Sequence, residues 1–260
     1  MFFAYYDQIP PERVFSQFGW QHILMLFICF AGIAALLLVL RRLKPAQVRT
    51  ALRLLALLVP LLELSHTYWL YQCGQHSIVK LLPLHLCAQQ SFFLPLAVYT
   101  NHTTLKEYVF STSILGGIFG MVFPEGVAGY YPALHYQTLQ TMALHSLLIL
   151  IPLALIVADG FRPKLANFPR VLGVFFIAVI PAAAVDFLFG ENYMFLNTAP
   201  AVTPLEFIYL HFGRAAYLLF TFVILCLAVI ALYRLFPYNR RQTQRRQSGR
   251  PAKAAPGSEK

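Results

Sequence analysis

Seven long apolar stretches are the feature that most constrains how this chain can fold. A bilayer core about 30 Å thick needs about 20 mostly apolar residues in a helix. Stretches of that length predict an all-α, polytopic integral membrane bundle of about seven transmembrane helices. The fourth stretch, short and rich in glycine, carries the weakest signal. The stretches cover roughly residues 20–40, 52–71, 81–99, 108–124, 136–158, 170–189 and 213–236.

The composition excludes an ordinary soluble domain. Hydrophobic residues make up 58% of the chain and charged residues only 12%, whereas soluble domains are near half apolar and a quarter charged. A soluble core cannot bury that excess. We therefore expect one membrane domain over residues 1–236, with the first apolar stretch retained as a span.

The basic residues predict the orientation of this bundle, because Lys and Arg are retained on the cytoplasmic side during insertion. Seven spans with an outside amino terminus leave only Arg13, Lys80 and Arg214 of the 20 basic residues outside. The carboxyl terminus is then cytoplasmic. The net charge of +10 lies in loops and in the tail, which does not favour a nucleic-acid partner.

The segment 237–260 is rich in Arg, Gln, Pro and Ser and has few apolar residues. Such a composition cannot offset the entropy of ordering, so we expect a disordered basic cytoplasmic tail. Two readings stay open for it. It attracts anionic lipid head groups, or it is only a solvated topological anchor.

Ionisable side chains inside the predicted spans are costly and often mark a site. At 1.5 Å per helical residue, four different spans place them in one outer layer, while the cytoplasmic halves are nearly bare. This layer predicts a site that opens toward the outer leaflet. Its members are Glu63, His66, His85, Cys87, His145 and Asp186.

Cys87 is the candidate nucleophile of this layer. With Pro83 in the first turn of the third span, His85 and Cys87 point to opposite sides of the helix, so the base must come from another span. His145, alone in an apolar stretch, is the natural candidate. Two alternatives are an inert buried thiol and a disulfide between Cys87 and Cys73.

Other polar residues have supporting roles with open alternatives. Glu63 and His66 are spaced i, i+3, so the carboxylate orients or charges the imidazole, or the two only fix helix packing. The segment 190–197, with Asn192 and Tyr193, is either a lid over the polar layer or an interfacial connector. The cysteine spacing is not a zinc pattern, and we expect no metal and no cofactor.

The order of these motifs resembles the YwaF-like branch of the transmembrane protein 164 family. The resemblance covers roughly residues 50–220. It rests on the run Leu82-Pro83-Leu84-His85-Leu86-Cys87, then Phe123-Pro124, then His145, then Asn192-Tyr193-Met194-Phe195-Leu196. It implies a multi-pass protein of the bacterial cytoplasmic membrane. The eukaryotic branch of that family looks like a lipid acyltransferase, so the resemblance also implies this activity, with Cys87 as nucleophile and His145 as general base and acid.

The leading hypothesis is therefore transfer or cleavage of fatty acyl chains on a membrane phospholipid, with a lysophospholipid as an acceptor. Gln89 or Asn192 would stabilise the oxyanion. The runner-up is a non-catalytic lipid or small-solute binding or transport protein, in which the polar layer lines a cavity. In a third reading the polar residues only hold helices together.

Overall fold

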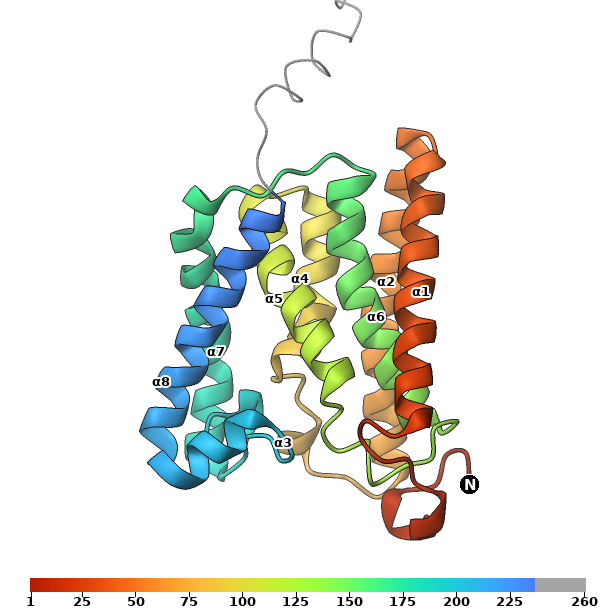
Figure 1. Ribbon diagram of the computed structural model, residues 1–260, viewed down its shortest axis with the longest axis vertical. Helices are drawn as coiled ribbons and strands as arrows, with labels where there is room; N and C mark the ends of the chain where they lie inside the picture. The colour runs from red at the N-terminus through yellow and green to blue at the C-terminus, as the bar shows by residue number, and fades with distance from the viewer. Residues whose placement is uncertain (237–260) are drawn as a thin grey trace, which may run out of the picture.

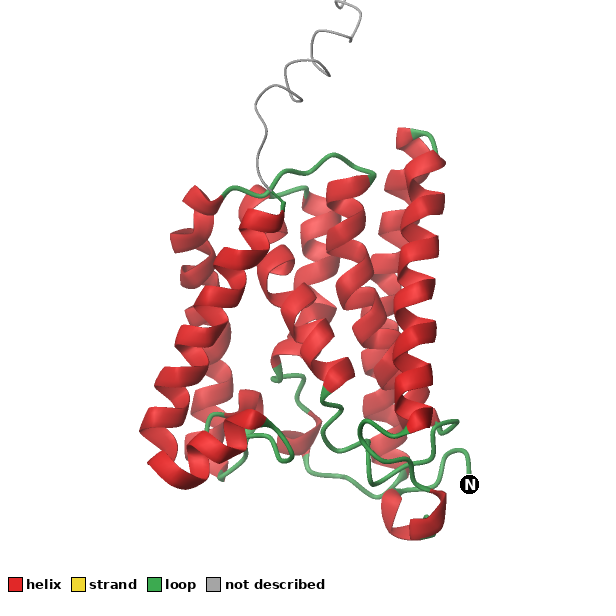
Figure 2. Ribbon diagram, viewed as in Figure 1, coloured by secondary structure: helices red, strands yellow, loops and turns green. Residues whose placement is uncertain are grey.

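The structure, a computed structural model, describes residues 1–236 as an all-α bundle, and this part of the chain contains no strand. The long helices run side by side, and the loops gather at the two ends (Figures 1 and 2). The all-α prediction is confirmed. The bundle helices are α1 (Trp20–Arg42), α2 (Pro45–Gln72), α4 (Leu86–Thr100), α5 (Thr103–Val122), α6 (Tyr136–Val157), α7 (Phe168–Phe189) and α8 (Pro204–Leu235).

Each bundle helix overlaps one of the seven predicted stretches. Within residues 1–236, four helical segments are both long enough and apolar enough to cross a membrane, namely Trp20–Arg42, Tyr136–Val157, Leu165–Phe189 and Pro204–Leu235. Their lengths of 22 to 32 residues exceed the roughly 20 that a bilayer core requires. The tail predicted over 237–260 lies outside the described residues.

Several predicted boundaries were wrong for local reasons. The third stretch is divided into a short helix α3 (Ile78–Leu81), a break, and α4 from Leu86. The fourth stretch begins earlier, at Thr103, so it is a full 20-residue helix. The last helix begins at Pro204 and is broken at Gly213, whose φ of 79° is non-helical, so the predicted span starts at this break.

Helix α5 lies at the centre of the bundle. It packs against α4, α6, α7 and α8, while α2 packs against α4 and α6, and α1 packs against α6. In Figure 1, α7 and α8 lie on one side of α4–α6, with α1 and α2 on the other. Most of α5 is buried, whereas α1, α7 and α8 expose many large apolar side chains. Exposed apolar faces of this kind suit contact with lipid.

Residues 1–19, α3 and the loop 190–203 gather at one end of the bundle, here called the N-terminal end. The first residues are held there through their carbonyl groups. Trp69 Nε1 donates to Phe3 O at 2.9 Å, and His135 Nε2 donates to Ala4 O at 3.1 Å. The His135 tautomer follows from its Nδ1, which accepts the N–H of Gln137. The N-terminal segment therefore caps α2 and α6.

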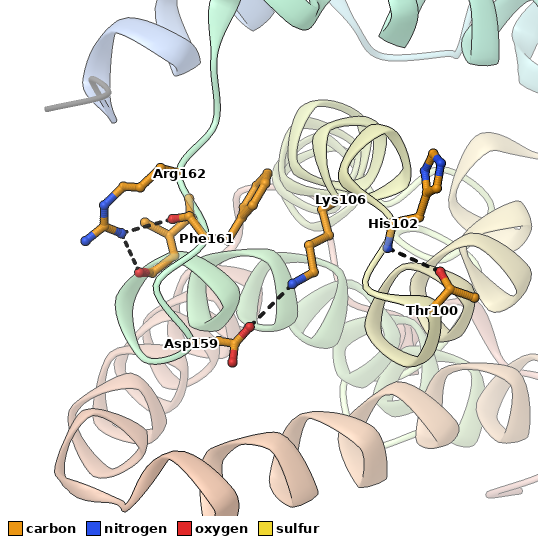
Figure 3. A network of polar contacts seen from close by, with 7 residues as sticks. Thr100, His102, Lys106, Asp159, Phe161 and Arg162 are labelled. Atoms are coloured by element: carbon orange, nitrogen blue, oxygen red, sulfur yellow. Dashed lines mark hydrogen bonds and ion pairs between the residues drawn. The ribbon is translucent and has the colours of Figure 1, made fainter. Parts of the chain in front are cut away.

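The opposite end of the bundle carries its own polar network (Figure 3). Lys106 Nζ lies 3.4 Å from Asp159 Oδ2. Arg162 donates to the carbonyl groups of Ile156 and Phe161, at the end of α6. The ion pair joins the first turn of α5 to the loop that follows α6, and the Arg162 bonds hold this loop against the end of α6.

A buried carboxylate, Glu107, completes this network. Its Oε2 accepts the Tyr233 hydroxyl at 2.6 Å, and its Oε1 accepts from Asn167 Nδ2 at 2.8 Å and Lys164 N at 3.0 Å. Buried charges require such partners. The expectation that this half of the bundle is nearly bare of ionisable groups was wrong, because α5 starts five residues earlier than predicted.

Candidate functional site

A proline sets where α4 begins. Leu82 precedes Pro83 and has the extended conformation that residues before proline adopt (φ −68°, ψ 136°). His85 is also extended (φ −63°, ψ 146°) and is the N-cap of α4. The prediction that Pro83 lies in the first turn, with His85 and Cys87 on one helix, was therefore wrong. Cys87 is instead the second residue of α4.

This position changes the chemistry available to Cys87. The first N–H groups of a helix have no intrahelical partner and carry a partial positive charge. Cys87 Sγ lies 3.7 Å from the carbonyl oxygen of Gly116 on α5. Glu63 of α2 is close enough for a charge interaction with it.

His145 on α6 is held in one tautomer. Its Nδ1 lies 2.8 Å from the carbonyl oxygen of Thr141, and a carbonyl can only accept, so Nδ1 carries the proton. Nε2 then keeps its lone pair, as a general base requires. The ring packs onto Gly120 of α5, where a Cβ atom would lie only 2.2 Å from Nε2.

Gly116 and Gly120 form a glycine strip on α5 that both predicted catalytic residues contact. They are spaced i, i+4, so they lie on one face of α5, about 6 Å apart along the axis. A Cβ at Gly116 would lie 3.4 Å from Cys87 Sγ, and one at Gly120 would meet the His145 ring. Thiol and imidazole thus reach the same strip from α4 and α6.

Glu63 and His66 have different neighbours, although both lie on α2. Glu63 interacts electrostatically with Tyr136 as well as with Cys87. The His66 ring stacks on Trp69, with centroids 6.0 Å apart, and His66 interacts with the charge of His85. No hydrogen bond joins Glu63 to His66 in the described chain. The i, i+3 spacing alone therefore does not produce a Glu–His pair.

The segment after α7 folds over the start of α4. Tyr193 donates its backbone N–H to Asp186 Oδ1 at 2.7 Å, and its hydroxyl donates to the carbonyl oxygen of Val79. Burial raises the pKa of Tyr193 to about 12, so this hydroxyl stays protonated. Met194 donates its N–H to His85 Nδ1 at 3.3 Å. The segment therefore links α7 to the chain that precedes α4.

The amides of Gln89 and Asn192 are committed to structure. Gln89 Nε2 donates to the carbonyl oxygens of Leu84, at 3.1 Å, and Ala178, at 2.9 Å. Asn192 Nδ2 donates to the backbone carbonyl and the hydroxyl of Thr198. Both N–H groups of each amide are thus used. Neither side chain therefore has a free N–H group with which to stabilise an oxyanion, the role predicted for these two residues.

The disulfide considered between Cys73 and Cys87 is not formed, since all four cysteines are free. Cys73 is the C-cap of α2 and lies 3.9 Å from the carbonyl oxygen of Phe3. Burial, and then the neighbouring Asp7 carboxylate, raise the pKa of the Cys73 thiol. The two cysteines therefore lie in separate environments.

Some contacts of the site were not anticipated from the sequence. The Tyr136 hydroxyl donates to Ser65 Oγ at 2.8 Å, beneath the N-terminal segment. His22 of α1 is fully buried and reaches the carbonyl oxygen of Met121 at 2.9 Å. Only the concentration of aromatic residues near the amino terminus hinted at such a cap. Within residues 1–236, no group of three His, Cys, Asp or Glu side chains could hold a metal ion.

The apolar helices and the polar groups buried between them define a helical membrane protein. The chain belongs to the TMEM164 family, whose model matches residues 17–234. This confirms the resemblance at the level of the family, and the match includes every candidate site residue. Searches of curated proteins and of solved structures found no match.

Proposed function

We propose that this protein transfers or cleaves fatty acyl chains of membrane phospholipids through a cysteine nucleophile. The observation that carries the proposal is the glycine strip of α5, where the Cys87 thiol lies at Gly116 and the unprotonated nitrogen of His145 lies at Gly120, four residues further on. A nucleophile activated by an adjacent base is the usual arrangement of covalent acyl transfer. Membership of the family supports the proposal, since the eukaryotic branch of that family looks like a lipid acyltransferase.

In the first half of the reaction, Cys87 Sγ bonds to the carbonyl carbon of a phospholipid ester, and the thiol proton passes to His145 Nε2. The lysolipid alkoxide then leaves and takes this proton, so that an acyl thioester remains on Cys87. The unpaired N–H groups in the first turn of α4 stabilise the oxyanion, in place of Gln89 and Asn192. A lysophospholipid or water accepts the acyl group in the second half.

We further propose seven spans in a bacterial cytoplasmic membrane, with the N-terminal end of the bundle outside and the chain in the YwaF-like branch. The basic residues support this orientation, and residues 237–260 would contact anionic head groups from the cytoplasm. A membrane-impermeant maleimide on intact cells should therefore label a cysteine placed at Gln75, but not one placed at Asn167. Labelling of only the second would reverse the orientation.

Acyl transfer itself can be tested with purified protein in nanodiscs that contain a phosphatidylcholine with one fluorescent acyl chain. With 1-palmitoyl-lysophosphatidylcholine added, we expect the fluorescent chain to appear on the acceptor, or as free fatty acid without it. Saturable binding of the lipid without any change in its structure would favour the alternative, a non-catalytic lipid or solute binding protein. Glu63, which has no hydrogen-bond partner within residues 1–236, and the neighbouring histidines would then line the binding cavity.

A further inference from the structure

A narrow groove lies between α7 and α8, in the half of the bundle that contains Glu107. Both helices pack on α5 but make little contact with each other, and they lie side by side in Figure 1. Ser111 and Thr112 of α5 form the floor of the groove. Its walls are formed by Phe168, Val171 and Phe175 of α7 and by Phe222, Cys226 and Val229 of α8.

The groove offers apolar surface to a ligand. The hydroxyls of Ser111 and Thr112 each donate at 2.8 Å to a backbone carbonyl oxygen one turn earlier in α5, so neither proton is left for a ligand. Phe176 and Val223, which follow wall residues along α7 and α8, are exposed. The groove therefore opens on a surface of the kind that contacts lipid, and it suits a lipid acyl chain.

The length of the groove confines it to one leaflet. Phe168 and Phe175 are seven residues apart, about 10 Å along α7, whereas one leaflet contributes roughly 15 Å of the hydrocarbon core. Toward the middle of the bundle, the rings of Phe176 and Phe222 meet across the two helices, with centroids 5.9 Å apart. The groove thus belongs to a lipid whose head group lies beside Phe168, the first residue of α7. In the proposed orientation this is the cytoplasmic side.

The chain is basic at this end of the groove. Asn167, just before α7, and Tyr233, near the end of α8, both donate to the Glu107 carboxylate, so these ends of the two helices lie close together. Arg170 is in the first turn of α7 and Arg234 in the last turn of α8. Both are exposed and form no hydrogen bond or ion pair within the described chain. Guanidinium groups in this position favour a phosphate group.

We propose that this groove binds one acyl chain of an anionic phospholipid such as phosphatidylglycerol, whose phosphate interacts with Arg170 and Arg234. Basic sites between membrane helices on the cytoplasmic side are suited to anionic lipids. The sequence continues from α8 into residues 237–260, which carry seven more basic residues and would contact the same leaflet. This binding does not involve Cys87, so failure of the site would leave the proposed acyl transfer unaffected.

Phosphatidylglycerol that carries a diazirine in one acyl chain would locate this lipid directly. After irradiation of the wild-type protein in phosphatidylcholine nanodiscs, we expect cross-links within residues 168–175 and 222–229. Unlabelled phosphatidylglycerol should compete for them. Phosphatidylcholine with the same diazirine should label the exposed faces of α1, α7 and α8 without preference for the groove. Equal labelling of the groove by the two probes would overturn the proposal.

A double variant tests the head-group contact. Arg170→Gln combined with Arg234→Gln should weaken the competition by phosphatidylglycerol about 10- to 30-fold. The matched control, Arg41→Gln combined with Arg42→Gln, removes two exposed charges at the same end of the bundle but from α1. It should compete like the wild type. Equal losses in both double variants would show only a general attraction to basic residues and would overturn the site.

A third variant tests the acyl-chain contact. Cys226→Phe places a ring in the groove and should reduce its labelling by phosphatidylglycerol about tenfold. Leu227→Phe adds the same ring at the next residue, which is exposed and does not line the groove, so its labelling should match the wild type. Unchanged labelling of Cys226→Phe would show that the chain does not lie in the groove.

Discussion

Replacing Cys87 with serine should abolish acyl transfer, with a loss of at least about 10³-fold, the order expected when an essential nucleophile is removed. A serine hydroxyl fits the same space beside Gly116, so the fold should be retained. Its proton is far harder to remove than that of a thiol. The readout is the rate of fluorescent acyl transfer in nanodiscs.

Cys73→Ser is the matched control for this variant. The Cys73 thiol lies at the C-cap of α2, beside the carbonyl oxygen of Phe3, so it should contribute nothing to the reaction. We expect wild-type transfer from it. If Cys87→Ser retained more than about a tenth of the wild-type rate, the thiol would not be the nucleophile.

Replacing Gly120 with alanine should greatly reduce the rate of Cys87 acylation, although α5 contributes no catalytic side chain. The new Cβ would lie 2.2 Å from His145 Nε2 and 2.5 Å from Cδ2, so the imidazole must move. Displacing a general base typically costs about 10²-fold or more in rate. We expect Cys87 acylation to fall by that order, measured as a single-turnover rate.

The control for Gly120→Ala is Gly173→Ala on α7, where a new Cβ meets nothing within 4 Å. Alanine is favoured over glycine in a helix by about 1 kcal/mol, so this variant should keep wild-type activity and melt no earlier than the wild type. Steric strain at Gly120 would instead cost about 1–3 kcal/mol. Full activity of Gly120→Ala would show that His145 need not lie on the glycine strip.

The sequence predicted the helices of the bundle well, because runs of apolar residues with few charges leave little alternative to a membrane helix. Helix ends were less predictable. Lys106 and Glu107 appeared too polar for a span, yet Glu107 is buried because Tyr233, Asn167 and the backbone of Lys164 satisfy its oxygens. Those partners come from distant parts of the chain, so local composition does not reveal them.

The candidate site was predictable as a set of residues but not as an arrangement. Depth along the helices placed Glu63, His85 and Asp186 in one layer, and in the structure Asp186 interacts with His85, while Glu63 and Asp186 both interact with Tyr193. It could not show that α4 begins at Leu86, because the break depends on how Pro83 and the segment after α7 pack together. Nor could it assign the tautomers of His85 and His145, which follow from backbone partners such as Met194 and Thr141.

Mass spectrometry of the protein after incubation with phosphatidylcholine should show whether Cys87 carries the acyl chain. We expect the peptide containing Cys87 to gain the mass of one acyl group, neutral hydroxylamine to remove this group, and Gly120→Ala to form the adduct slowly. Acyl transfer that proceeds with no adduct on Cys87, or with the adduct on another residue, would contradict this expectation.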